Sequence, residues 1–289
     1  MKVNGERLRL PDSHELLAEA RAFGAKKRLG QNFLIDPDRL ARIAGALAIA
    51  PGDIVLEIGP GLGFLTRTLA ASRAQVTAVE LDQAAVAHLQ ALALPGVQVV
   101  HGDFLAFDVG QLGGRVKVVG NVPYQITSRI LCHLLGEIDE PSPWLAAIER
   151  VVMTVQLEVA ERFVASPGGK DYSQISLLAQ YYSKPSLLEK VPAGSFFPAP
   201  AVTSAVVMFE PLPAPAVACV NRRLLRQVIQ AGFSQRRKML RNNLGFLHLS
   251  PGELDRVFAQ LRLDPQARAE RLSLTQFALL TDALHEVVK

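Results

Sequence analysis

Four consecutive residues, Asn121-Val122-Pro123-Tyr124, combine groups that suit methylation of a base amino group. The exocyclic nitrogen of adenine is a poor nucleophile because its lone pair is delocalised into the ring. The side-chain oxygen of Asn121 and the carbonyl of Val122 could accept its two hydrogens and favour a pyramidal nitrogen. Pro123 fixes φ for a turn, and Tyr124 offers a ring on which an extruded base can stack. We therefore predict methylation of adenine N6, although a β-turn with a core tyrosine could use the same residues.

A glycine-rich string, Glu57-Ile58-Gly59-Pro60-Gly61-Leu62-Gly63, has the composition of a nucleotide-binding turn. Gly59 and Gly61 lack side chains, so the main chain there can approach a ligand closely. A dinucleotide-dependent dehydrogenase is an alternative, but the glycine pattern of such enzymes needs glycine at the position that Phe64 occupies here. Glu57, two residues before the first glycine, is more typical of methyltransferases.

Two further acids follow strand-like runs downstream of the glycines. Glu80 ends the run 75–79, where its carboxylate could accept both ribose hydroxyls of a nucleoside cofactor. Asp103 follows the run 97–100 and could accept a hydrogen bond from the adenine amino group of the same cofactor. Taken singly, Glu80 could be a solvated strand end and Asp103 a helix N-cap.

The elements that position these residues are predicted from apolar runs at 54–58, 75–79, 97–100 and 116–119. Helical or loop segments of crossover length separate the runs, and Asp36-Pro37-Asp38 is typical of a helix start before the first of them. This alternation predicts an α/β class, a doubly wound Rossmann-like methyltransferase sheet. Because parallel strands end at one edge, Gly59, Glu80 and Asp103 should meet in one crevice, which favours S-adenosylmethionine as the cofactor.

The rest of the chain predicts a second, smaller domain. Residues 151–158 and 201–210 have the pattern of strands that extend the sheet, and 211–215 is a proline-rich linker. Everything after the linker has a helical pattern. We therefore predict an N-terminal extension at 1–25, a methyltransferase domain at 26–210 and an all-helical substrate domain at 211–289.

Composition excludes several classes of protein. The 289 residues are 49% hydrophobic and 20% charged, with no apolar run long enough to cross a bilayer and no signal-peptide pattern. Cys132 and Cys219 lie far apart without metal-ligand spacing. We expect a cytoplasmic monomer that binds neither a membrane nor a metal.

Basic residues are concentrated near the C-terminus. Residues 213–289 hold 12 Lys and Arg against 6 Asp and Glu, whereas the preceding residues hold 19 against 21. Within this region, cations without an intervening acid occur at Arg222, Arg223, Arg226, Arg236, Arg237, Lys238 and Arg241. Such a run suits RNA phosphates, and a cationic helix face that packs on the rest of the protein is the alternative.

From Lys26 onward the chain resembles the KsgA-like ribosomal RNA adenine dimethyltransferases. Besides the motifs above, the resemblance is carried by the strings Lys27–Leu34, Phe196–Val206 and Phe233–Leu244. It implies that Asn32 and Leu34 contact the cofactor and that Phe197 helps to enclose the target base. The third string is similar to the small-subunit branch of the family.

The resemblance implies two successive methyl transfers to N6 of two adjacent adenines near the 3′ end of small-subunit (16S) ribosomal RNA, in an immature 30S particle. Two alternatives stay open. A large-subunit (23S) adenine methyltransferase of the antibiotic-resistance type would share the cofactor motifs and Asn121, but the string around Arg236 argues against it. An assembly factor could act mainly by binding, although Glu80, Asp103 and Asn121 favour catalysis.

Overall fold

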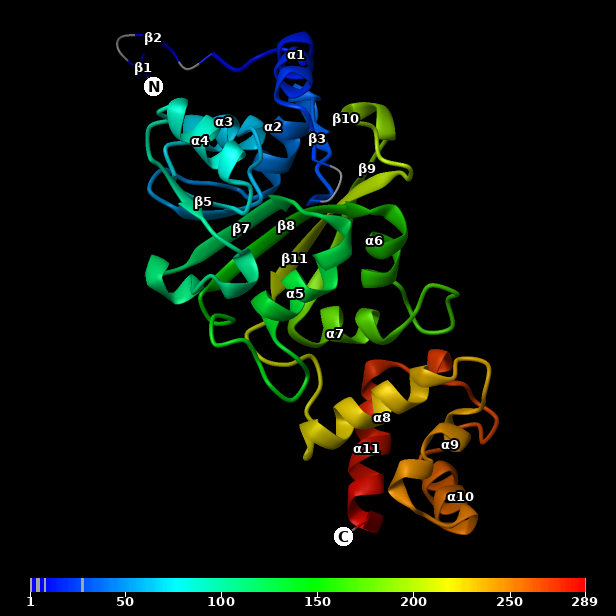
Figure 1. Ribbon diagram of the computed structural model, residues 1–289. Helices are drawn as coiled ribbons and strands as arrows, with labels where there is room; N and C mark the ends of the chain where they lie inside the picture. The colour runs from blue at the N-terminus through cyan, green and yellow to red at the C-terminus, as the bar shows by residue number, and fades with distance from the viewer. Residues whose placement is uncertain (1, 4–5, 8, 27–28, 289) are drawn as a thin grey trace. The chain divides into compact units, whose positions relative to one another are not determined.

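The computed structural model describes residues 2–3, 6–7, 9–26 and 29–288, and the chain divides into two compact units (Figure 1). The first unit comprises Met1–Leu134, Pro143–Ala160 and Ser186–Pro211, and the second comprises Leu135–Ser142, Glu161–Pro185 and Leu212–Lys289. The second unit thus includes two segments that precede the linker. The domain limits given above, 1–25, 26–210 and 211–289, stay a prediction.

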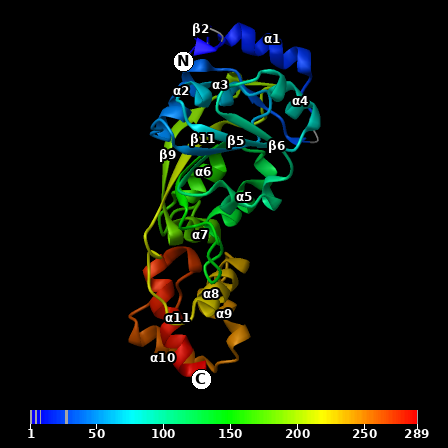
Figure 2. The same ribbon diagram turned by 90° about the vertical axis from the view of Figure 1, so that its left-hand side faces the viewer.

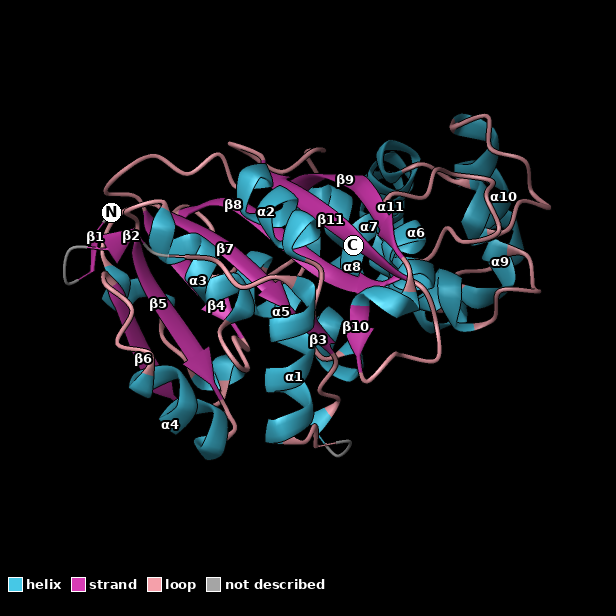
Figure 3. Ribbon diagram, turned by 90° about the horizontal axis from the view of Figure 1, so that it is seen from above, coloured by secondary structure: helices cyan, strands magenta, loops and turns pink. Residues whose placement is uncertain are grey.

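Within the described residues, one sheet of seven strands has the order β6-β5-β4-β7-β8-β11-β9 (Figure 3). Its strands are β4 (Ile54–Ile58), β5 (Gln75–Glu80), β6 (Val97–His101), β7 (Val116–Asn121), β8 (Ile148–Gln156), β9 (Ser183–Val191) and β11 (Ser204–Pro211). The five strands β6, β5, β4, β7 and β8 pair with one another in parallel. On the other side of β8, β11 pairs with it in antiparallel orientation. Helices cover both faces of the parallel part, which explains why β4 and β7 are almost wholly buried.

The helices of the first unit are α1 (Ser13–Phe23), α2 (Pro37–Ala46), α3 (Phe64–Ala71), α4 (Gln83–Ala91) and α5 (Thr127–Leu135). Figure 2 shows α2, α3 and α4 on one face of the sheet and α5 on the other. The start of α2 follows from its sequence, because the Asp36 carboxylate accepts from the Arg39 amide at 3.2 Å and Pro37 occupies the first turn. Its apolar side chains Leu40 and Ile43 are buried in the hydrophobic core of this unit.

A separate two-stranded ribbon lies beside the large sheet. It pairs β3 (Phe33–Leu34) with β10 (Phe196–Phe197) in antiparallel register, with Phe33 opposite Phe197 (Figures 1 and 3). A second pair joins β1 (Lys2–Val3) to β2 (Glu6–Arg7). The β3–β10 ribbon brings together segments that are about half the chain apart.

The second unit is helical. It contains the last three residues of α6 (Leu157–Phe163), together with α7 (Gln174–Tyr182), α8 (Arg222–Ser234), α9 (Leu240–Asn243), α10 (Pro251–Gln260) and α11 (Leu274–Val288). Its core is formed by apolar residues at helical spacing, among them Leu225, Ile229, Phe277 and Leu284, all fully buried. Short 3₁₀ turns occur elsewhere in the chain at Phe104–Ala106, Val109–Leu112, Tyr124–Ile126, Ala193–Ser195, Gly245–Leu247 and Ala269–Arg271.

The predicted fold class is confirmed, since the sheet, its parallel core and the helices on both faces match a Rossmann-like arrangement. The four predicted core strands appear as β4 to β7, each with the predicted first residue. The limits of two runs were wrong. The run 151–158 is not strand throughout, because β8 spans Ile148–Gln156 and α6 begins at Leu157, and the run 201–210 becomes strand only at Ser204. The edge strand β9 was not predicted.

Candidate active site

A single cavity opens at the carboxyl ends of β4, β5, β6 and β7. The space between protein atoms there is about 950 Å³, including the open solvent at its mouth. The eight residues predicted to bind a cofactor all line it: Asn32, Leu34, Glu57, Gly59, Gly61, Glu80, Asp103 and Asn121. The structure therefore brings together residues that are up to 89 positions apart, while their ligand stays a prediction.

The floor of the cavity is the turn between β4 and α3. Gly59, Gly61 and Gly63 have φ of 63°, 56° and 76°, in the left-handed region that favours glycine. A side chain at Gly61 would also meet the Phe33 ring, whose Cε1 lies 2.9 Å from the position of an added Cβ, and one at Gly63 would collide with Leu89. The glycines are thus required both by the backbone and by the packing around it.

Two buried acids lie beside this turn. Glu80 is 6% exposed, and its carboxylate accepts from the Gly61 amide and from the Asp82 amide, both at 2.8 Å. Glu57 is 2% exposed, and its Oε2 has no hydrogen-bond partner in the part of the chain that the structure describes. Burial raises the pKa of Glu57 to about 8, and the charge of Glu80 adds to the rise. Burial also raises the pKa of Glu80, against the effect of its two amide donors. A cationic ligand in the cavity would favour the ionised form of both acids.

The other side of the cavity is polar at its rim. Asp103 is exposed and caps the turn that follows β6, where its Oδ1 accepts from the Leu105 amide at 2.9 Å. Asp103 is therefore both the N-cap of this turn and a residue of the cavity wall. Leu81, which directly follows Glu80, lines the same rim and is 55% exposed. An exposed leucine beside a cavity mouth can pack against a planar base, and its position after Glu80 is the signal that could have singled it out.

The segment before β3 forms a further wall. Lys26 and Gln31 both bind the Asp82 carboxylate, through Lys26 Nζ at 2.6 Å and Gln31 Nε2 at 3.0 Å. Burial opposes ionisation of Asp82, but these two donors outweigh it and hold the pKa of the carboxyl below its ordinary value. Gln31 lines the cavity and was missed by the sequence analysis, although it lies within the string similar to the family. Lys27 and Arg28 of that string lie outside the described residues.

The predicted reactive residues lie where β7 ends. Asn121 is the last residue of β7, and its Nδ2 donates to the Asn32 carbonyl at 2.7 Å. Val122 is buried, and its amide donates to the Thr154 carbonyl at 3.3 Å. Pro123 has φ −58° and ψ 129° and lines the cavity with Asn121. Because Asn32 belongs to the opposite wall, the Asn121 amide connects the two sides of the cavity.

Tyr124 begins a 3₁₀ turn and is half-buried. Its hydroxyl lies 2.6 Å from the Ser204 Oγ, so the ring is held at both ends. Burial raises the pKa of this hydroxyl, and the hydrogen bond with Ser204 acts in the opposite direction. The phenol is therefore neutral at physiological pH and can serve as a fixed aromatic surface.

Phe197 lies on β10 rather than among the residues of the cavity wall. It is half-buried against the core of the first unit, and the Arg21 guanidinium lies 5.8 Å from the centre of its ring. Through the ribbon it is opposite Phe33, which does line the cavity. Its predicted contact with a target base stays a prediction.

The basic residues of the second unit fall into two groups. Arg236 and Arg241 have protein partners: Arg236 Nη2 donates to the carbonyls of Lys170 and Tyr172 at 2.9 and 3.1 Å, and Arg241 Nη1 lies 2.8 Å from Asp255 Oδ1. The second group comprises Arg222, Arg223, Arg237 and Lys238, which are exposed, as Arg236 also is. Arg236 and Arg241 thus brace the unit through protein acceptors, although Arg236 also faces solvent.

Among the described residues, no cluster of three or more His, Cys, Asp or Glu side chains could hold a metal ion. No described helix is both long enough and apolar enough to span a membrane.

The chain is similar to known proteins over most of its length. A family described as ribosomal RNA adenine dimethylase matches residues 22–286. A protein of Desulfitobacterium hafniense named ribosomal RNA small subunit methyltransferase A is 43% identical over 265 residues, which cover 90% of this chain and 92% of the relative. A protein of Aromatoleum aromaticum with the same name is 39% identical over 260 residues, covering 89% and 93%.

Two solved structures have similar folds. The 23S rRNA methyltransferase ErmE superposes with a TM-score of 0.67 at 26% identity, covering 88% of this chain and all of that one. A dimethyladenosine transferase from Plasmodium falciparum has a TM-score of 0.69 at 23% identity, covering 86% and 95%. The second likeness supports the fold alone.

Proposed function

Because this chain belongs to the ribosomal RNA adenine dimethylase family, we propose that it dimethylates N6 of two adjacent adenines near the 3′ end of small-subunit (16S) ribosomal RNA. The observation that carries the proposal is the position of Asn121. It ends β7 in the same cavity as the glycine turn, Glu80 and Asp103. An amide oxygen beside a cavity lined by glycines and carboxylates suits the alkylation of an amino group.

The residues of the cavity fit S-adenosylmethionine. Each oxygen of the Glu80 carboxylate accepts one backbone amide and keeps a further lone pair, which would accept a hydrogen bond from a ribose hydroxyl. Asp103 would accept a hydrogen bond from the adenine amino group. Glu57, buried and with Oε2 unpartnered among the described residues, suits a ligand that carries positive charge. When bound, the cofactor supplies an electrophilic methyl group on a sulfonium.

The protein's own contribution is then to hold the target nitrogen. Asn121 Oδ1 and the Val122 carbonyl accept the amino hydrogens and localise the nitrogen lone pair. Tyr124, fixed by Ser204, stacks on the extruded base and orients it for in-line transfer. Alignment by these fixed groups carries most of the acceleration, because the reaction needs no side chain to act as a strong base.

The proposed partner is the RNA of an immature 30S particle, and the protein acts as a cytoplasmic monomer. Exposed Arg237 and Lys238 would contact its phosphates. An alternative substrate is large-subunit RNA, favoured by the likeness to ErmE at 26% identity. The small-subunit relatives are more similar, at 39% and 43% identity, and therefore favour the first substrate.

The test is transfer of labelled methyl from S-adenosylmethionine to immature small and large subunits, followed by nucleoside analysis of the RNA. We expect dimethyladenosine in small-subunit RNA with wild-type protein and none with Asn121→Ala. Label confined to the large subunit would select the alternative substrate. Binding of the particle without label in either RNA would favour an assembly factor that acts by binding.

A further inference from the structure

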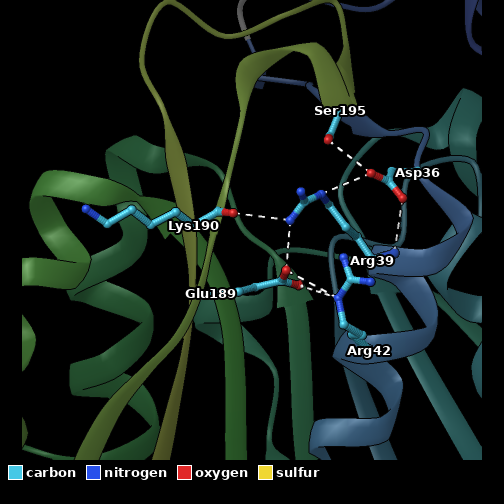
Figure 4. Close-up of polar contacts among 6 residues, drawn as sticks. All are labelled: Asp36, Arg39, Arg42, Glu189, Lys190 and Ser195. Carbon is cyan, nitrogen blue, oxygen red and sulfur yellow. Dashed lines mark hydrogen bonds and ion pairs between the residues drawn. The ribbon is translucent and has the colours of Figure 1, made fainter.

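A polar network joins the start of α2 to the end of β9 and to the turn that leads into β10 (Figure 4). Arg39 is its centre: Nε donates to Asp36 Oδ2 at 3.0 Å, and Nη1 donates to Glu189 Oε2 at 2.8 Å and to the Lys190 carbonyl at 3.2 Å. Ser195 Oγ donates to the same Asp36 Oδ2 at 3.1 Å. The segment 189–195 is thus bound to α2 near both of its ends.

The network acts where the ribbon itself is weak. The β3–β10 pairing spans two residues on each strand, and short isolated ribbons have marginal stability. A backbone bond from the Ile35 amide to the Ser195 carbonyl, 2.9 Å long, extends the pairing by one step. After Ile35, the Asp36 side chain binds Ser195, and the Arg39 side chain binds Glu189 and the Lys190 carbonyl. These bonds outside the two strands therefore support the register of Phe197 against Phe33, together with the burial of Phe33, Leu34 and Phe196 in the core.

Arg39 suits this role better than another cation would. Its side chain is 18% exposed, and its planar guanidinium presents donors to three acceptors in fixed directions. Lysine could satisfy the charge of Glu189 but could not reach Asp36 and the Lys190 carbonyl in the same geometry. Arg42, one turn further along α2, is 54% exposed and contacts only Glu189 among these groups, at 3.3 Å or more.

The two strands of the ribbon carry different parts of the proposed site. On β3, Phe33 and Leu34 line the cofactor cavity, and on β10, Phe197 is the residue predicted to enclose the target base. A shift of β10 would move Phe197 while leaving Glu80 and Asp103 in place.

We propose that Arg39 is a positioning residue for methyl transfer: it orients the Asp36 carboxylate that binds Ser195 and fixes the end of β9 through Glu189. It thereby holds the turn before β10 so that Phe197 lies beside the target base. This inference rests on the proposed function. It predicts that loss of Arg39 slows transfer at saturating cofactor, because the base is misplaced, while cofactor affinity changes little.

The experiment is a double-mutant cycle on single-turnover transfer to small-subunit RNA, with Arg39→Met, Phe197→Ala and the double variant. We expect Arg39→Met to lower the rate about tenfold with Phe197 present and less than about twofold in the Phe197→Ala background. The dissociation constant of S-adenosylmethionine, measured by calorimetry, should stay within about twofold of wild type. Arg42→Met is the matched control and should leave the rate unchanged.

The outcomes separate the two proposals. Equal losses from Arg39→Met in both backgrounds, or an equal loss from Arg42→Met, would overturn the positioning role. A wild-type protein that methylates no small-subunit RNA would instead overturn the proposed function. If Arg39→Met does not fold, Ser195→Ala removes only the bond to Asp36 and should show the same dependence on Phe197 with a smaller loss; additivity there would overturn the inference.

Discussion

The Nδ2 atom of Asn121 donates a 2.7 Å hydrogen bond to the main-chain carbonyl of Asn32. Since a carbonyl only accepts, the amide nitrogen must face Asn32, and Oδ1 must point the other way. The bond therefore determines which end of the Asn121 amide is available to a substrate. It also makes the wall that contains Asn32 part of the catalytic geometry, because that wall orients Asn121.

Asn121→Ala should lower methyl transfer by more than about 100-fold, because the target amino group loses a fixed acceptor. The dissociation constant of S-adenosylmethionine should change by less than about threefold, since most of the proposed cofactor contacts lie on Glu80, Asp103 and the glycine turn. Single-turnover transfer and calorimetry measure the two quantities. If cofactor affinity fell by the same factor as the transfer rate, the role assigned to Asn121 would be wrong.

Glu80→Gln should act mainly on cofactor binding. The carboxylate accepts from two backbone amides, and an amide side chain would turn an NH₂ group toward one of those donors. We expect the dissociation constant of S-adenosylmethionine to rise by about tenfold or more, with a smaller change in the transfer rate at saturating cofactor. An unchanged dissociation constant would count against the ribose contact.

The raised pKa of Glu57 predicts a pH dependence of stability. The side chain ionises near its ordinary value of 4.5 in the unfolded chain and at about 8 in the folded protein. The stability that it contributes is therefore full below pH 4.5 and is lost as the pH rises toward 8. Glu57→Gln keeps a neutral side chain throughout, so by pH 8 its free energy of unfolding should exceed that of wild type by more than about 1 kcal/mol.

Urea unfolding at several pH values measures this difference. Glu286→Gln, a change of the same kind at an exposed position, should leave the pH profile unaltered. Parallel profiles for wild type and Glu57→Gln would contradict the raised pKa.

The parallel core and its acids were predictable because each strand is a short apolar run with a distinctive residue at its carboxyl end. Topology then brings such ends to one edge, which explains why Glu80, Asp103 and Asn121 meet. The β3–β10 ribbon was not predictable, since two-residue strands leave no periodicity. The edge strand β9 mixes Lys184, Pro185 and Glu189 with apolar residues, because one side of an edge strand has no pairing partner and tolerates proline.

The position of α1 could not be predicted either, because the resemblance to the family begins only at Lys26. Its Glu19 carboxylate binds Arg67 through two bonds of 2.9 and 2.6 Å and His88 Nε2 at 2.7 Å. These partners are 48 and 69 positions away, and nothing in the local pattern around Glu19 indicates them.

Glu19→Gln should loosen α1. Burial raises the pKa of Glu19, but Arg67 and His88 outweigh it, so the pKa lies below its ordinary value. The corresponding stability is present above about pH 4.5 and is lost as the pH falls through the lower, folded pKa. At neutral pH we expect a loss of about 1–3 kcal/mol and faster hydrogen exchange of the α1 amides.

Arg9→Met is the control for Glu19→Gln, since the pair that Arg9 forms with Glu15 in the first turn of the same helix is exposed and should contribute less than about 0.5 kcal/mol. Unaltered exchange in α1 with Glu19→Gln would mean that other contacts hold the helix.

Two neighbouring cations in the second unit should behave differently when replaced. Arg237 is exposed, so Arg237→Met should reduce the salt dependence of RNA binding by about one unit of the log–log slope without a change in the melting temperature. Arg236 donates to the carbonyls of Lys170 and Tyr172, so Arg236→Met should lower the melting temperature by leaving those acceptors unpaired. Filter binding of small-subunit RNA across a salt series, together with calorimetric melting, separates the two effects. The assignment fails if Arg236→Met reduces the salt slope with no loss of stability, because Arg236 would then be a phosphate contact rather than a brace.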